Sequence, residues 1–370
     1  MLADGAEFDR SSAKAKENTI SAIIQLAHKS RPNQDAIAAA GGLELLVEAL
    51  TSSTASTKDS EALTQSSLAA EAVWRMSEDH ADNKVAIAEL GGIGPLVGML
   101  GSEAVKPELC TNAAGALASL SRDNMENQSA IARTGAIAPL CSLVREASME
   151  TKEQSASALW ALSVDNSANK ATIAKLGGIE PLVGLLVTGT TVTSTKMAAG
   201  ALSSLAAKHT DNRQSISKRL VALLNSKGAE RAGRALDALS TLAQTDAANQ
   251  IAVAKAGGIP QIIMWLCSDT DDVRLQAATA LLAIIAENAT TQVTLLSCSP
   301  CSLPTPSLLP PCSPYSLLLS FSPALLLYCS PTPLLSYLLA SRPPTGTGRS
   351  VRGHRAAHHN RRHERVAPGA

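Results

Sequence analysis

Residues 169–186 read NKATIAKLGGIEPLVGLL, and residues 83–100 read NKVAIAELGGIGPLVGML. The same phrase begins at residue 33 as NQDAIAAAGGLELLVEAL, at 127 as NQSAIARTGAIAPLCSL and at 249 as NQIAVAKAGGIPQIIMWL. With an altered copy at residue 212, the initial asparagines are spaced by 50, 44, 42, 43 and 37 residues. A period of this size is typical of solenoids built from three-helix repeats.

Each part of the phrase predicts a piece of local structure. Asparagine is a good N-cap, so we expect a short helix to begin at each of Asn33, Asn83, Asn127, Asn169, Asn212 and Asn249. The Gly-Gly pair ends that helix where a positive φ is needed, and proline two residues after the next isoleucine suits the first turn of a second helix. Apolar residues at helical spacing, such as Ala156, Leu159 and Leu162, then predict a third, longer helix.

This pattern resembles the armadillo repeat, and the resemblance covers residues 12–290. It implies an all-α fold, a right-handed α-solenoid of about six repeats with three helices each. We expect residues 1–11 to be disordered and residues 296–370 to form a low-complexity, basic tail.

Two stretches depart from the repeat. The Ser/Thr-rich segment from Thr51 to Ser67 contains extra residues, which form either a solvated loop or a loop regulated by phosphorylation. The repeat over residues 212–248 lacks the Gly-Gly-Ile-x-Pro turn and is therefore degenerate. Either the solenoid has a kink there, or the sequence crosses a mis-spliced exon junction.

The tail has a composition of its own. From Leu295 through Ser341 it is uncharged and consists mainly of Ser, Pro, Leu and Cys, which is what a translated pyrimidine-rich intron would give. A membrane anchor over residues 315–340 is an alternative, although three prolines interrupt it. A zinc site at Cys298, Cys301, Cys312 and Cys329 has unsuitable spacing, and the basic end could bind nucleic acid or direct nuclear import.

Charge and cysteine usage narrow the class of protein. Lys plus Arg equals Asp plus Glu at 32 each, but seven arginines and one acid lie in residues 342–370, so the rest of the chain is mildly acidic. An acidic body is poorly suited to binding a phosphate backbone. Cys110, Cys141 and Cys267 are scattered through helical patterns, as thiols in a reducing compartment are, and no apolar signal stretch follows Met1. We therefore expect a cytoplasmic or nuclear protein.

No catalytic constellation is present in the repeats. His28, His80 and His209 are far apart, and each is expected to lie as a cation at the end of a third helix. The Gly-Gly pairs recur once per repeat, as turns do and phosphate-binding loops do not. The sequence predicts no enzyme activity, no cofactor, no metal site and no small-molecule substrate.

The resemblance implies that the third helices line a concave groove that binds a partner. Positions opposite the apolar stripe form the pairs Glu71/Arg75, Gly115/Ser119, Ser157/Ala161, Gly200/Ser204, Arg234/Ala238 and Thr279/Ala283, and we expect these to face solvent. Importin-α-like proteins carry Trp and Asn at these positions, and none is found here. Trp74 and Trp160 lie beside the pairs, either as packing between repeats or as anchors for a partner.

These inferences together predict a protein-interaction scaffold that binds an extended or helical segment in the groove. The candidate contact residues are Glu71, Trp74, Arg75, Ser119, Ser157, Trp160, Ala161, Ser204, Arg234 and Ala238. The chain is most similar to the broad class that includes the vacuolar-inheritance scaffold and the armadillo tails of U-box ligases. An alternative function is that of a substrate-recognition adaptor for a ubiquitin ligase. We expect neither nucleic acid nor membrane as a partner, unless residues 315–340 form an anchor.

Overall fold

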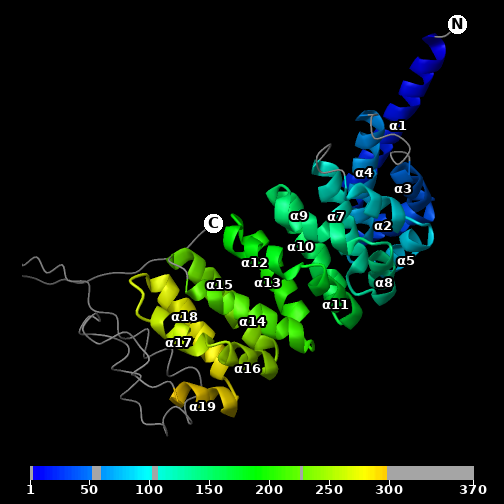
Figure 1. Ribbon diagram of the computed structural model, residues 1–370. Coiled ribbons are helices and arrows are strands. Elements are labelled where there is room, and N and C mark those ends of the chain that lie inside the picture. The colour runs from blue at the N-terminus through cyan, green and yellow to red at the C-terminus, as the bar shows by residue number, and fades with distance from the viewer. Residues whose placement is uncertain (1–2, 52–59, 102–106, 226–227, 298–370) are drawn as a thin grey trace, which may run out of the picture. The chain divides into compact units, whose positions relative to one another are not determined.

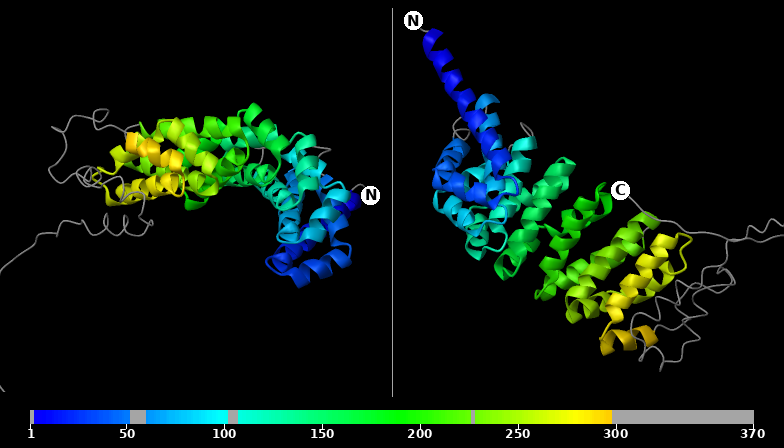
Figure 2. Two further views of the ribbon diagram at one scale, coloured as in Figure 1. Left: turned by 90° about the horizontal axis from the view of Figure 1, so that it is seen from below. Right: turned by 180° about the vertical axis from the view of Figure 1, so that it is seen from behind.

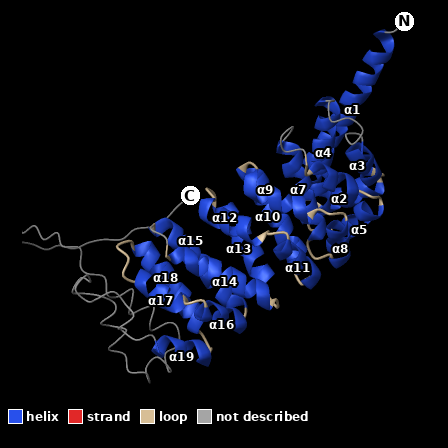
Figure 3. Cartoon of the chain, in the orientation of Figure 1, coloured by secondary structure: helices blue, strands red, loops and turns tan. Residues whose placement is uncertain are grey.

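The computed structural model describes residues 3–51, 60–101, 107–225 and 228–297. The chain divides into two units, residues 1–327 and 328–370, and all the described residues belong to the first. They form nineteen helices and contain no strand (Figure 3). The all-α solenoid predicted from the repeat is confirmed for this part of the chain. The predicted tail from residue 298, including the alternatives of an anchor and a zinc site, lies outside the described residues.

The helices fall into three sets that alternate along the chain. The first helices are α2 (Arg31–Ala39), α5 (Ala81–Glu89), α8 (Met125–Arg133), α11 (Ser167–Lys175), α16 (Ala247–Lys255) and α19 (Ala289–Ser297). The second helices are α3 (Gly42–Thr51), α6 (Ile93–Met99), α9 (Ile137–Glu146), α12 (Ile179–Thr188) and α17 (Gly258–Trp265). The third helices are α4 (Ser60–Ser77), α7 (Pro107–Ser121), α10 (Met149–Ser163), α13 (Val192–Ala206), α15 (Ala229–Thr245) and α18 (Asp271–Ile285).

The third helices pack side by side in chain order, each against the next, and the second helix of each complete repeat packs against its own third helix (Figures 1 and 2). The core lies between these layers. In α10 the predicted stripe of Ala156, Leu159 and Leu162 is fully buried. The burial of one such stripe per repeat gives the stack a continuous apolar core, as expected of a solenoid.

The chain begins with a long helix, α1 (Ala3–Ala27), which packs along α4 in the place of a preceding third helix. Helix therefore extends into residues 1–11, for which the sequence predicted disorder. Helix α1 as a whole is rich in alanine and contains two lysines and two glutamates, which are strong helix formers. Farther along, Lys14 Nζ lies 2.8 Å from Glu17 Oε2 and links adjacent turns of the same helix. Of the predicted loop at 51–67, residues 52–59 lie outside the described residues and α4 includes the remainder from Ser60.

The Gly-Gly pair turns the chain between a first and a second helix. Between α11 and α12 the axes bend by 78°, and Gly177 takes a φ of 75° at the turn. A Cβ on Gly178 would lie 2.7 Å from Ile173 Cγ2 and 2.8 Å from Cys141 Sγ. The first glycine is thus required by its backbone conformation and the second by close packing.

The degenerate repeat has a single helix where the others have two. α14 (Thr210–Leu224) runs without interruption through the place where the Gly-Gly turn is missing. Its later residues, Leu220, Val221 and Leu224, are buried in the manner of a second helix. The structure accommodates the shorter repeat by replacing a bent pair of helices with one continuous helix.

The prediction that the repeated asparagines are N-caps is wrong. The caps lie three residues earlier, where the side chains of His80, Asn124, Asn166 and His209 accept the backbone N–H of the repeated asparagine. The repeated asparagine points inward instead. In a representative repeat, Asn127 Nδ2 donates to Leu120 O at 3.1 Å and to Lys84 O of the preceding repeat at 3.0 Å. The asparagine therefore joins neighbouring repeats through buried backbone carbonyls.

The prediction that the histidines lie at the ends of third helices is also corrected for two of them. His80 Nδ1 accepts from Asn83 N. Its Nε2 lies 2.8 Å from Asp35 Oδ1. His209 caps α14 through the same nitrogen. Both rings begin a helix rather than complement the end of one.

The residue after the repeated asparagine links the first helix of a repeat to the end of its own third helix. In five of the six repeats this residue is Gln or Lys, and its side chain donates to a carbonyl there. In the fifth repeat it is Arg213, which instead contacts Asn249 and Asp246. The five bonds to carbonyls are Gln34 Nε2 to Arg75 O, Lys84 Nζ to Arg122 O, Gln128 Nε2 to Ala161 O, Lys170 Nζ to Ala207 O and Gln250 Nε2 to Ala283 O. Burial lowers the pKa of Lys84 and of Lys170. Each bond satisfies a carbonyl that the end of a helix leaves without an internal partner.

Among the described residues, no single helix is both long and apolar enough to cross a bilayer. The pair α11 and α12 reaches the required length and composition only across its 78° bend.

Candidate partner-binding face

The third helices share one face that no other set of described helices covers. We call it the third-helix face, and it consists of the sides of α4, α7, α10, α13, α15 and α18 turned away from the second helices. Six of the ten predicted contact residues are half-buried, and all six belong to third helices. They are Glu71, Trp74, Arg75, Trp160, Ser204 and Arg234.

The other four are buried, which contradicts the expectation that these positions face solvent. They are Ser119, Ala238, Ala161 and Ser157, with 2%, 4%, 7% and 9% of their surface exposed. Neighbouring third helices approach closely enough to cover them. Ser77 Oγ donates to Ser119 Oγ at 2.9 Å, and Ser163 Oγ donates to Ser204 Oγ at 2.8 Å. Ser119 and Ser204 thus link consecutive third helices instead of standing free for a partner.

Both tryptophans lie at the seam between consecutive third helices. A Cβ on Gly115 would come within 2.5 Å of the Trp74 ring, and a Cβ on Gly200 within 2.7 Å of the Trp160 ring. Each indole therefore lies directly on a glycine of the next third helix. This geometry favours packing between repeats as the role of the two rings, while the half-exposed edges remain on the third-helix face.

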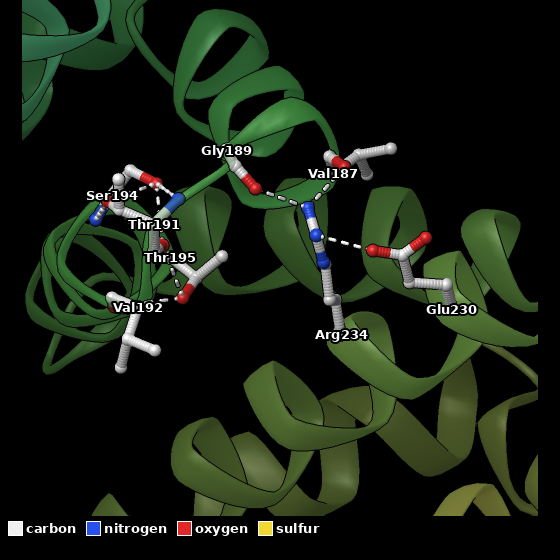
Figure 4. Close-up of polar contacts among 8 residues, drawn as sticks. All are labelled: Val187, Gly189, Thr191, Val192, Ser194, Thr195, Glu230 and Arg234. Carbon is white, nitrogen blue, oxygen red and sulfur yellow. Dashed lines mark hydrogen bonds and ion pairs between the residues drawn. The ribbon is translucent and has the colours of Figure 1, made fainter.

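The two predicted basic groups are already engaged within the chain. Arg75 lies over the Trp74 ring, 4.9 Å from its centre, and pairs with Glu71 at 3.3 Å. Arg234 Nη1 donates to Val187 O at 2.8 Å and to Gly189 O at 2.5 Å, and Nη2 pairs with Glu230 (Figure 4). Figure 4 shows that Arg234 reaches from α15 to the end of α12, where its charge complements the carbonyl end of that helix. Neither arginine is free to attract an acidic partner.

A hollow opens on this face toward the N-terminal ends of α4, α7 and α10. Its volume is about 290 Å³, and it is lined by Thr64, Ser67, Leu68, Glu71, Pro107, Glu108, Thr111, Asn112, Ser148 and Glu150. Of these residues, only Glu71 was predicted as a contact from the sequence. The helical spacing could have indicated three more, because Thr64, Glu108 and Glu150 stand two helical turns before the first members of the predicted pairs. The predicted stripe ends short of this hollow.

Carboxylates dominate the polar groups of the hollow. Glu108 and Glu150 are exposed, and neither has an ion-pair partner among the described residues. The Nδ2 of Asn112 donates to Ser67 O at 3.1 Å and to Ser67 Oγ at 3.2 Å. The side-chain carbonyl oxygen of Asn112 takes no part in these two bonds. The hollow therefore offers acceptors and negative charge, and it is complementary to a cationic donor.

The described residues contain no group of three His, Cys, Asp or Glu side chains placed to hold a metal ion. Cys110 and Cys141 are buried, and burial raises the pKa of Cys141 to about 11. A thiol with that pKa is almost wholly protonated at neutral pH and is a poor nucleophile. The chemistry that the third-helix face offers is recognition through packing, hydrogen bonding and charge.

The amino-acid sequence matches a known repeat family over its central part. Residues 80–122, 124–164 and 166–207 each match the model of the armadillo/beta-catenin-like repeat. The three segments contain α5 to α13 with the turns between them. No curated protein matches the chain.

Solved structures with the same arrangement of helices include designed proteins. A crystal structure of an engineered protein is 28% identical, has a TM-score of 0.59, and covers 77% of this chain and 68% of that chain. A second engineered protein is 29% identical with a TM-score of 0.51, over 66% of this chain and 96% of that chain. A designed armadillo repeat protein in complex with the peptide (KR)4 is 22% identical with a TM-score of 0.50, over 65% and 99%. The described part of the chain therefore has the fold of an armadillo-repeat solenoid.

Proposed function

We propose that this armadillo-repeat solenoid is a protein-interaction scaffold that binds a segment of a partner, extended or helical, across its third-helix face. The observation that carries the proposal is the hollow between α4, α7 and α10 with its two unshared carboxylates, Glu108 and Glu150. Glu108 and Glu150 form no ion pair among the described residues, so both carboxylates are available to a partner protein. A partner segment bearing lysine or arginine is the one that this hollow favours.

The fold supports a binding role. Armadillo solenoids present a long row of parallel helices, which suits the recognition of segments rather than of small molecules. The designed armadillo repeat protein that shares this fold binds a peptide of Lys and Arg, which supports a peptide as the type of ligand. Catalysis finds no support in the described part of the chain, where the charged groups of the third-helix face form ion pairs or line an open hollow.

The proposal is tested by reversing the two carboxylates. We expect Glu108→Lys with Glu150→Lys to weaken binding of a labelled octapeptide of alternating Lys and Arg by about tenfold or more, measured by fluorescence anisotropy. The matched control is Glu126→Lys. Glu126 holds the same place in the first turn of α8, among the first helices and away from the third-helix face, so it costs α8 the same helix-dipole interaction. Equal affinity for the double variant and the control would exclude the hollow as the site.

A second candidate is the substrate-recognition adaptor of a ubiquitin ligase. The same third-helix face would then bind the substrate, while another surface would bind the ligase. Affinity purification of the chain separates the two functions, since ligase subunits co-purify only with an adaptor. We propose that the protein acts in the cytoplasm or nucleus, in keeping with the buried thiol of Cys141, and imaging of a tagged chain tests this location.

A further inference from the structure

The continuous helix α14 leaves a second hollow beside it, on the side of the first helices. Its volume is about 370 Å³, and it is lined by Thr210, Arg213, Gln214, Lys218, Ala248, Ile251, Ala252, Lys255 and Ala256. All nine residues belong to α14, to α16 or to the residue that ends α16. None belongs to a third helix, so this hollow is separate from the third-helix face.

The floor of this hollow is apolar. Ile251 and the small side chains of Ala248, Ala252 and Ala256 come from one side of α16. Ile251 and Ala256 are only half-buried, so part of their apolar surface remains open to water. The helix α16 carries no acidic residue at all. An apolar floor of this size can take up a side chain of a partner and remove its surface from water.

The rim of the hollow is cationic. Lys218 and Lys255 are exposed, occupy the same position relative to Asn212 and Asn249, and have no ion-pair partner among the described residues. The same position in the two preceding repeats holds Arg133 and Lys175, each in the last turn of its helix. A cation there complements the carbonyl end of a helix. That explanation does not apply to Lys218, which lies in the middle of α14.

Acidic groups near the hollow do not cancel this charge. Asp246 is bound by Arg213, whose Nη2 lies 2.9 Å from Asp246 Oδ2 and whose Nε donates to Asn249 Oδ1 at 2.7 Å. Asp211 is exposed in the first turn of α14 and is the remaining acid of that helix. Arg213 forms a fixed wall of the hollow, and the two lysines stand beside the apolar floor without an ion-pair partner among the described residues.

We propose that this hollow is a second docking site, for an acidic segment of a partner protein that carries an apolar anchor residue. The lysines bind the carboxylates of the segment, and the floor formed by Ile251 and the alanines receives the anchor. A nucleic acid or an anionic membrane would use the positive charge but not the enclosed apolar floor. The site arises because the fifth repeat lacks its Gly-Gly turn, and it is independent of the function proposed above.

The test uses the full chain and a fluorescein-labelled decapeptide of alternating Glu and Leu, with anisotropy as the readout. We expect Lys218→Glu with Lys255→Glu to weaken binding by about tenfold or more, since like charges then face each other. Ile251→Ala removes the apolar floor while leaving the charge, and a loss of about threefold to tenfold is expected. The matched control is Lys175→Glu, which changes the same position in the preceding repeat, outside the hollow.

Thermal unfolding of each variant shows whether it is folded, and Lys218→Gln with Lys255→Gln supplies a milder pair. The proposal holds if both pairs and Ile251→Ala weaken binding while Lys175→Glu does not. It is overturned if the lysine pairs bind like the unaltered chain, or if Lys175→Glu has an equal effect. Tighter binding of a single-stranded oligonucleotide or of phosphatidylserine vesicles than of the peptide, insensitive to Ile251→Ala, also overturns it.

Discussion

A single missing methyl group sets the distance between two third helices at Gly115. The Trp74 ring lies where a Cβ of residue 115 would be, and the same arrangement recurs between Trp160 and Gly200. A substitution that is harmless elsewhere in a helix is therefore costly here. At these two places the distance between consecutive third helices depends on an indole in one helix and on a glycine, which has no side chain, in the next.

We predict that Gly115→Ala lowers the free energy of unfolding by about 1–3 kcal/mol, the usual cost of overpacking a closed interface. The added Cβ would lie 2.5 Å from Trp74 Cε3. Gly184→Ala is the control, because Gly184 lies in α12 with nothing within 4 Å of its Cβ position. There the helix propensity of alanine should raise stability by about 0.5–1 kcal/mol. Urea unfolding measures both, and equal effects would contradict the close packing at the seam.

The lysines that link a first helix to its own third helix make the stability of the chain depend on pH. Because burial lowers the pKa of Lys84 and Lys170 below the 10.5 of the unfolded chain, the charged form is disfavoured in the folded state. That penalty is fully present below the folded pKa. It is relieved as the pH rises through the folded pKa toward 10.5.

We therefore predict that the unaltered chain gains stability over Lys84→Gln with Lys170→Gln as the pH is raised from neutral toward 10.5. Glutamine is the appropriate replacement because Gln34, Gln128 and Gln250 make the same link in other repeats. Urea unfolding of both proteins at a series of pH values supplies the comparison. If the difference in the free energy of unfolding between the two proteins stayed constant across the series, folding would not lower the pKa of these two lysines.

At the scale of single helices, most of the boundaries could be predicted from the phrase, while the caps could not. The Gly-Gly pair and the proline mark turns through backbone conformations that few other residues adopt. Asparagine is a good cap, and in some repeats the residue three positions earlier is an equally good one, whereas in two others it is histidine. Near the start of α8 both Asn124 and Asn127 are good candidates, and only the packing against the preceding repeat decides between them.

The candidate site was predictable in outline for a similar reason. The direction of the stripe follows from helical periodicity, and it led to Glu71, Trp74 and Arg75 on the third-helix face. The burial of Ser119 could not be foreseen, because a single helix does not reveal how closely its neighbour approaches. The hollow depends on where α7 and α10 begin, which the apolar pattern fixes only to within a turn.

For α14 we predict that the backbone amides of residues 216–219 exchange slowly with solvent. In a continuous helix each is bonded within the helix, whereas the first turn of a separate second helix leaves its amides without a partner in that helix. Hydrogen exchange followed by mass spectrometry gives the comparison with Ile179 and Glu180, in the first turn of α12. Rapid exchange over residues 216–219 would mean that the fifth repeat is bent like the others.

At the scale of the solenoid, the loss of one core side chain should destabilise the neighbouring helices more than the distant ones. Leu159 is fully buried in α10, so Leu159→Ala should cost about 2–5 kcal/mol. Because each repeat contacts its neighbours and few others, we expect faster hydrogen exchange in α7, α10 and α13 but little change in α16 and α18. A uniform increase across all described helices would indicate that the array unfolds as a single cooperative body.

The placement of the tryptophans has an optical consequence. The chain contains three of them, and each lies at a different junction between repeats. Trp74 lies against Gly115, Trp160 lies against Gly200, and Trp265 Nε1 donates to Leu224 O at 3.0 Å. Indole emission shifts to longer wavelength when the ring enters water, so the natural fluorescence of this protein is a sum of three local signals. A set of variants that each keep one indole would therefore report the order in which the early, middle and late junctions separate, without any added dye.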